Sequence, residues 1–241
     1  MTNYIAEISQ RRAALVAGLG IVALAIVAGF AYGFVFQSFV VPGDATATAN
    51  NIKASEMLFR IGFFSWLAIL ILDVLVAWAL YIFLKPVHKS LSLLAAWLRL
   101  VYTAILGTAL LNFVIVSLLL SGTDYLSVFK TDQLNALALL FLSAFDAIFS
   151  IGLVIFGLHL LTLGYLVSKS GYIPKILGIL LLIASLGYLI TSSASLLLPN
   201  YKAIAELIFV APMIIGELGF GLWLIVKGGK DAQNEILKVA K

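Results

Sequence analysis

Four ionisable side chains lie deep within the long apolar stretches of this sequence, and they are the residues best suited to chemistry. They are Asp73, Arg99, His159 and Glu217. Two carboxyls, a guanidinium and an imidazole can form an ion pair, relay protons, bind a cation, or act as a general acid and base. Because a charge in lipid costs at least roughly 2.5–3.5 kcal/mol on insertion scales, each needs a structural or functional reason.

Counting from the nearest basic residue in a flanking loop gives these four side chains similar depths. Asp73 is 12 residues from Lys85, so at about 1.5 Å per residue it lies about 18 Å deep. The other three are each 10 residues from such a lysine, which puts them about 15 Å deep. Since the hydrocarbon core is about 30 Å thick, all four are expected in one mid-membrane layer.

Each member of this layer has a structural and a functional interpretation. An ion pair between adjacent helices explains Asp73 and Arg99 better than catalysis does, because their depths match within one turn. For His159, a hydrogen-bonded core position is favoured, with Glu217 or Tyr188 as the expected partner. Glu217 has no obvious cation if Asp73 satisfies Arg99. It could carry protons, bind a cation or hydrogen-bond to His159, and neither interpretation is preferred.

Two further acids, Asp146 and Glu206, lie nearer the opposite boundary. They are candidates for an outer vestibule, although a solvated rim is the preferred explanation of both. Two histidines and no cysteine exclude a histidine-rich or thiolate centre, and we expect neither a metal nor a cofactor. The sequence contains neither a P-loop nor a G-x-S-x-G motif. Catalytic residues are therefore unknown.

The composition implies that membrane-spanning helices position these residues. Hydrophobic residues make up 63% of the 241 and charged residues 11%, against about 45–50% and 25% in soluble domains. A spanning helix needs about 20 mostly apolar residues. Six stretches qualify: 13–40, 58–84, 91–120, 134–167, 173–198 and 203–226. We therefore predict an all-α, polytopic membrane bundle of six transmembrane helices, in one domain over 1–241.

The basic residues give this bundle an orientation. Most of them fall on the side of the two termini, and cytoplasmic loops carry the Lys/Arg excess, so both termini are predicted to be cytoplasmic. The first apolar stretch is far longer than the apolar part of a signal peptide and is expected to be a retained helix. This topology accounts for the net charge of +4 without a nucleic-acid partner, and the lipid bilayer is the expected surrounding.

Three segments carry a resemblance to a known family. They read VPGDATATANNIKASEMLFRIG (41–62), LILDVLVAWALYIFLKPVHKSLSLLAAWLRLV (70–101) and FGLHLLTLGYLVSKSGYIPKILGILLLIASLGYLI (156–190). The chain resembles, over about residues 11–225, an uncharacterised prokaryotic family of multispan membrane proteins known as a domain of unknown function, DUF4386. The resemblance implies the multispan topology and a prokaryotic cytoplasmic membrane, and it implies no activity.

Three functions remain open. The favoured hypothesis is a protein that binds or transports a small polar or amphipathic ligand, or protons, through the mid-membrane layer. The alternative is a lipid-modifying enzyme with His159 and Glu217 as acid and base, in a concave site open to one leaflet. A structural accessory subunit would instead have a dry, tightly paired layer and no cavity. The sequence is compatible with a small-molecule or lipid ligand and with oligomers, and it identifies neither.

Overall fold

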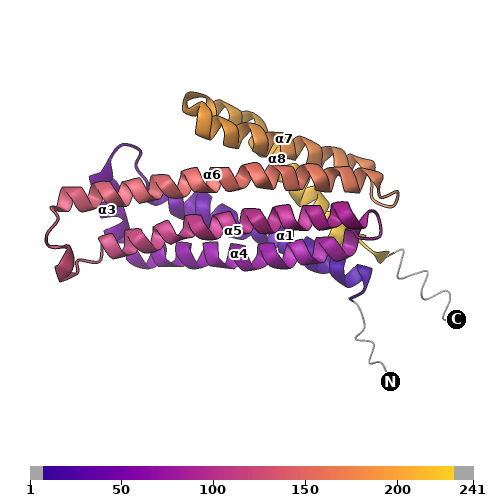
Figure 1. The fold of residues 1–241 in the computed structure, drawn as a ribbon, viewed down its shortest axis with the longest axis horizontal. Coiled ribbons are helices and arrows are strands. Elements are labelled where there is room, and N and C mark those ends of the chain that lie inside the picture. The colour runs from indigo at the N-terminus through magenta and orange to yellow at the C-terminus, as the bar shows by residue number, and fades with distance from the viewer. Residues whose placement is uncertain (1–7, 231–241) are drawn as a thin grey trace, which may run out of the picture.

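Six long helices run side by side in the computed structural model, which describes residues 8–230 (Figure 1). The first consists of α1 (Gln10–Ala28), the π-helical η1 (Gly29–Phe36) and α2 (Gln37–Phe39). The other five are α4 (Glu56–Leu84), α5 (Lys89–Leu119), α6 (Thr131–Lys169), α7 (Lys175–Leu197) and α8 (Lys202–Val226). The connections contain α3 (Ala45–Ala54), η2 (Asp124–Leu126) and η3 (Pro199–Tyr201). The predicted all-α fold is confirmed, and each predicted span boundary lies within three residues of an observed one.

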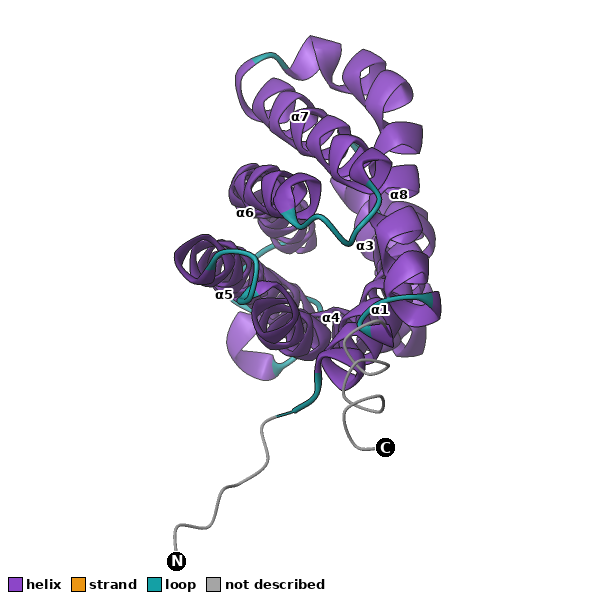
Figure 2. Cartoon of the chain, turned by 90° about the vertical axis from the view of Figure 1, so that its right-hand side faces the viewer, coloured by secondary structure: helices purple, strands orange, loops and turns teal. Residues whose placement is uncertain are grey.

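The six helices form a ring in chain order. α1 packs against α4. From α4 to α7, each long helix packs against the one that follows it in the chain. α8 returns to α1 and closes the ring, which Figure 2 shows end-on. Every helix therefore has one face toward the centre of the ring and another toward the outside.

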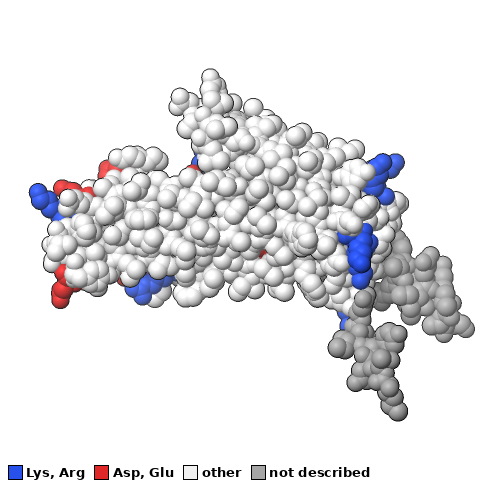
Figure 3. All heavy atoms as spheres, viewed as in Figure 1, with Lys and Arg blue, Asp and Glu red and all other residues white. Residues whose placement is uncertain are grey.

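The outer surface is that of a multi-pass membrane protein. All six helices are long and apolar enough to cross a bilayer, and large apolar side chains such as Leu207 are exposed on their outer faces. Charged side chains gather at the two ends of the molecule, and a largely uncharged band separates them (Figure 3). We call the end where α1 begins and α8 finishes the terminal end, and the opposite one the loop end. That the terminal end is cytoplasmic stays a prediction.

The turns at the terminal end follow from local sequence. α6 finishes at Lys169, and Gly171 then adopts a φ of +77°, a left-handed conformation that glycine takes without strain. Pro174 directly precedes α7, a position where its missing N–H is not needed. Between them, the Tyr172 hydroxyl donates to the Phe83 carbonyl at 3.3 Å, and burial raises the pKa of Tyr172 to about 12. This turn is thereby anchored to α4.

Arg11 joins the first helix to the last. Its guanidinium donates to the carbonyl oxygens of Leu224, Ile225 and Gly228, at 3.2, 2.6 and 2.9 Å. The last carbonyls of a helix have no partner within it, so this arginine caps α8 from a neighbouring helix. The α1–α8 contact that closes the ring is thus fixed at the terminal end.

Replacing Arg11 by alanine is expected to lower the free energy of unfolding by about 1.5–3 kcal/mol, the range for hydrogen bonds to a charged group. The neighbouring Arg12 is exposed, so Arg12→Ala is the matched control. Unfolding by titration with SDS in mixed micelles measures both variants. Equal loss in the two variants would contradict the capping role.

Candidate functional site

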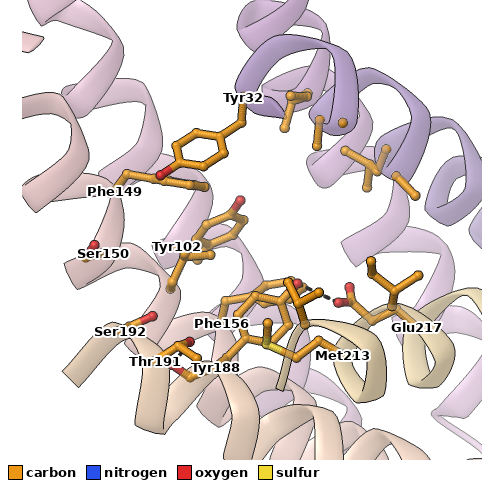
Figure 4. Close-up of a pocket in the computed structure, with 18 of the residues that line it drawn as sticks. Tyr32, Tyr102, Phe149, Ser150, Phe156, Tyr188, Thr191, Ser192, Met213 and Glu217 are labelled. Atoms are coloured by element: carbon orange, nitrogen blue, oxygen red, sulfur yellow. Dashed lines mark hydrogen bonds between the residues drawn. The ribbon is translucent and has the colours of Figure 1, made fainter. Parts of the chain in front are cut away.

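A cavity of about 670 Å³ lies inside the ring, and residues of all six long helices line it. Its volume is within the range of about 300–1,000 Å³ that is usual for small-molecule sites. Figure 4 shows aromatic and hydroxyl side chains pointing into it from several helices. Six ionisable residues other than tyrosine line it: Asp73, Arg99, Asp146, Lys202, Glu206 and Glu217. Five of the six predicted site residues therefore border one cavity, and His159 does not.

Packed side chains separate this cavity from both ends of the bundle. On the loop side, aromatic rings of η1, α4, α5 and α6 pack against one another, mostly tilted or edge to face; they are Phe36, Phe59, Trp66, Phe113 and Phe145. On the terminal side, Val76, Leu80 and Phe220 are almost completely buried. The central cavity therefore lies between two packed layers of side chains.

Asp73 and Arg99 form the ion pair expected from their matched depths. Asp73 Oδ1 accepts from Arg99 Nε at 2.9 Å and lies 2.6 Å from Nη2, and both side chains are at most 4% exposed. α4 and α5 are joined by a short turn, so residues at equal depth on their facing sides meet. A buried pair of this kind leaves a costly charge if either partner is removed.

His159 extends the pair to α6, and the predicted partner was wrong. It contacts neither Glu217 nor Tyr188 through a hydrogen bond; its Nε2 lies 3.3 Å from Arg99 Nη1 and its Nδ1 lies 2.8 Å from the Ala95 carbonyl. Arginine nitrogens only donate, so Nε2 accepts, and Nδ1 carries the hydrogen that Ala95 receives. His159 thus orients Arg99 from behind and does not form an acid–base pair with Glu217.

Glu217 has a partner of its own on α7. The Tyr188 hydroxyl donates to Glu217 Oε1 at 2.7 Å (dashed in Figure 4). Within residues 8–230, no lysine, arginine or histidine nitrogen lies within 4 Å of this carboxyl. Tyr188 is therefore the hydrogen-bond partner that the described residues show for Glu217, and the predicted contact with His159 is not formed.

Phe156 separates the two polar groups. Its ring lies 5.2 Å from the Arg99 guanidinium carbon, 5.5 Å from the His159 ring and 5.0 Å from the Tyr188 ring. The mid-membrane layer is consequently not one continuous hydrogen-bonded chain. It is a triad on α4, α5 and α6 and a pair on α7 and α8, with an aromatic ring between them.

A second polar cluster stands at the loop side of the cavity. Asp146 Oδ2 binds Lys202 Nζ at 2.9 Å, and Asp146 Oδ1 accepts from the Tyr32 hydroxyl at 3.0 Å. These three residues also line a further cavity of about 410 Å³ toward the loop end. Glu206 is exposed at the edge of the central cavity. The two acids predicted as a vestibule thus border the cavity, and Asp146 lies at its junction with a second one.

Several cavity residues were not singled out from the sequence. Tyr102 is one turn from Arg99 and Phe156 one turn from His159, so each shares a helical face with a predicted site residue. This one-turn spacing is the sequence signal that could have identified Tyr102 and Phe156 as cavity residues. Two other lining residues have a buried polar atom without a hydrogen-bond partner in the described part of the chain, Trp66 Nε1 and Ser192 Oγ. Such unsatisfied groups in a cavity wall are suited to a ligand.

Comparison with known proteins gives a family and a relative. Residues 16–228 match the model of a family described as a domain of unknown function (DUF4386). The chain is 40% identical over 162 residues to a protein of Archaeoglobus fulgidus described as an uncharacterized protein, covering 67% of this chain and 80% of the relative. No solved structure matches the chain.

Proposed function

The chain belongs to the DUF4386 family, and we propose that it is a membrane-embedded binding or transport protein that takes a small amphipathic molecule into its central cavity. The observation that carries the proposal is the cavity itself, about 670 Å³ at mid-height among six helices. An accessory protein that only holds helices together would be expected to fill this space with side chains.

The lining supports an amphipathic molecule over a purely polar one. Most of the wall is aromatic or aliphatic, and a few polar groups converge on it, among them Tyr102, Ser192 and Glu217. Ligand sites commonly combine an apolar wall with a few placed polar groups that fix orientation. Proton transfer alone would not require a space of this volume.

The cluster of Tyr32, Asp146 and Lys202 provides a route for transport. It borders both the central cavity and the 410 Å³ cavity beyond it. If the ion pair between Lys202 and Asp146 opens, the two spaces join and connect mid-membrane with the loop end. The ion pair is part-exposed, so its opening costs less than opening the buried Asp73–Arg99 pair would.

Two glycines one turn apart allow the binding proposal to be tested. Gly29 lines the cavity, and a Cβ added there would meet no atom within 4 Å. Gly29→Phe is therefore expected to fold and to fill the cavity from η1. Equilibrium binding to protein in lipid nanodiscs, with three phenyl-substituted probes (tetraphenylphosphonium, tetraphenylborate and triphenylphosphine oxide), should show saturable binding of at least one probe. Gly29→Phe should weaken that binding at least tenfold.

Gly33→Phe is the matched control. Gly33 also lies in η1 with open space around its Cβ, and it borders neither cavity. This variant should bind the probes as the native chain does. Loss of binding in both variants, or in neither, would contradict the proposal, as would the absence of saturable binding of every probe.

A further inference from the structure

The charges around the central cavity do not balance. Each of the two basic residues is held by one acid, Arg99 by Asp73 at 2.6 Å and Lys202 by Asp146 at 2.9 Å. Glu217 and Glu206 remain, and within residues 8–230 neither has a basic nitrogen within 4 Å. The cavity therefore has carboxyl groups in excess, which favour a ligand that brings a positive charge.

Glu217 is the better placed of the two to hold such a charge. One of its carboxyl oxygens accepts from Tyr188, and the other has no hydrogen-bond partner in the described part of the chain. It borders the cavity at mid-height, next to the apolar part of the wall (Figure 4). A cationic group bound there would gain an ion pair in a low-dielectric environment, where charge interactions are strong.

The wall around Glu217 suits an organic cation. Four aromatic residues line the cavity close to the mid-membrane polar groups: Trp66, Tyr102, Phe156 and Tyr188. Aromatic faces attract cations, and Phe156 already lies against Arg99 in this way. A metal ion fits less well, because the described residues contain no group of three acidic or histidine side chains that could hold one.

The cavity opens sideways, toward lipid. Its exposed lining residues all come from the α1–η1–α2 segment or from α8: Ala25, Gly29, Gln37, Glu206, Val210 and Ile214. At the terminal end these two helices touch closely, since a Cβ on Gly18 would lie 2.6 Å from the Gly221 carbonyl oxygen. Beside the opening, Ile26 and Leu207 are 68% and 83% exposed on the outer surface. A molecule dissolved in the bilayer can therefore reach the cavity without crossing water.

On the basis of the binding function proposed above, the geometry points to a lipophilic organic cation as the ligand, which enters from the bilayer between α1 and α8 and binds with its positive charge beside Glu217. Glu206, at the mouth, lies on its path. The aromatic wall holds the apolar groups of the cation. In the Asp73–Arg99 and Asp146–Lys202 ion pairs the partners neutralise one another's charges, so those four residues need no counterion from the ligand.

Two of the three probes, tetraphenylphosphonium and tetraphenylborate, have nearly the same size and shape and opposite charges, and triphenylphosphine oxide adds a neutral phenyl-substituted molecule. Native protein in nanodiscs, with binding to empty nanodiscs subtracted, should bind tetraphenylphosphonium at least tenfold more tightly than neutral triphenylphosphine oxide. Tetraphenylborate should bind more weakly still. This comparison needs no variant, so it stands even if a substitution affects folding.

Glu217→Gln removes the charge and keeps an oxygen that can accept from Tyr188. It should lower the affinity for tetraphenylphosphonium at least tenfold, as expected for the loss of one buried charge contact. The affinity for triphenylphosphine oxide should stay within about twofold of that of the native chain. Glu56→Gln is the control, since Glu56 is exposed at the loop end beside Arg60. It should change neither affinity.

The results separate the two proposals. Equal or tighter binding of the neutral or anionic probe, or unchanged cation affinity in Glu217→Gln, would overturn the cation assignment while leaving the binding function intact. Failure of all three probes to bind saturably would overturn the binding function itself.

Discussion

Arg99→Leu is expected to lower the free energy of unfolding by about 3–5 kcal/mol, because it leaves Asp73 as an uncompensated buried charge. Asp73 is 2% exposed, accepts a hydrogen bond from Arg99 Nε and lies 2.6 Å from Arg99 Nη2. His159 would also lose the donor to its Nε2. Unfolding by SDS titration of the purified protein, followed by far-ultraviolet circular dichroism, measures the change.

The double variant Asp73→Leu/Arg99→Leu distinguishes the loss of a pair from the loss of a side chain. It should recover part of the stability that Arg99→Leu loses, because no unpaired charge remains. Arg60→Leu is the control: Arg60 binds Glu56 at 3.3 Å, but both side chains are more than half exposed. That change should cost less than about 1 kcal/mol. A double variant no more stable than Arg99→Leu would contradict the ion-pair account.

Gly164→Ala is expected to destabilise the chain by about 1–3 kcal/mol, because α6 and α7 approach each other too closely for a Cβ. The added carbon would lie 2.9 Å from the Gly178 carbonyl oxygen and 3.0 Å from the Leu182 backbone nitrogen. Both atoms are backbone, so relief requires the helices to move apart. Thermal unfolding in detergent, followed by intrinsic fluorescence, measures the effect.

Gly107→Ala provides the comparison for that prediction. Gly107 lies within α5, and its added Cβ would meet only the end of the Leu70 side chain at an ordinary 3.7 Å. Alanine is the better helix former by about 0.8–1.0 kcal/mol, so this variant should be as stable as the native chain or more so. If Gly164→Ala were equally harmless, the close α6–α7 contact would not exist as described.

The spans and the Asp73–Arg99 pair could be predicted because they depend on one-dimensional information. Hydropathy locates the apolar stretches, and the breaks between them set the helix ends to within a few residues. α4 and α5 are consecutive and joined by a short turn, so two opposite charges at equal depth had few other partners. Depth therefore sufficed to pair Asp73 with Arg99.

The partner of His159 could not be predicted in the same way. Depth does not specify how a helix is rotated about its axis, and His159 faces α5 and not α8. The order of helices around the ring is also absent from the hydropathy pattern, so the link from Lys202 to Asp146 was not foreseen. The π-helical turn of η1, which carries Tyr32, has no hydropathy signature either, since it changes the period and not the composition.

The proposed function requires the space inside the ring to be a binding site. Crystals of the protein grown with tetraphenylarsonium test it most directly, because arsenic gives an anomalous signal that locates the cation without assumptions about its pose. The account predicts the strongest arsenic peak inside the cavity, between Tyr102 and Glu217. Arsenic peaks confined to the lipid-facing surface, with the cavity closed by repacked side chains, would contradict it.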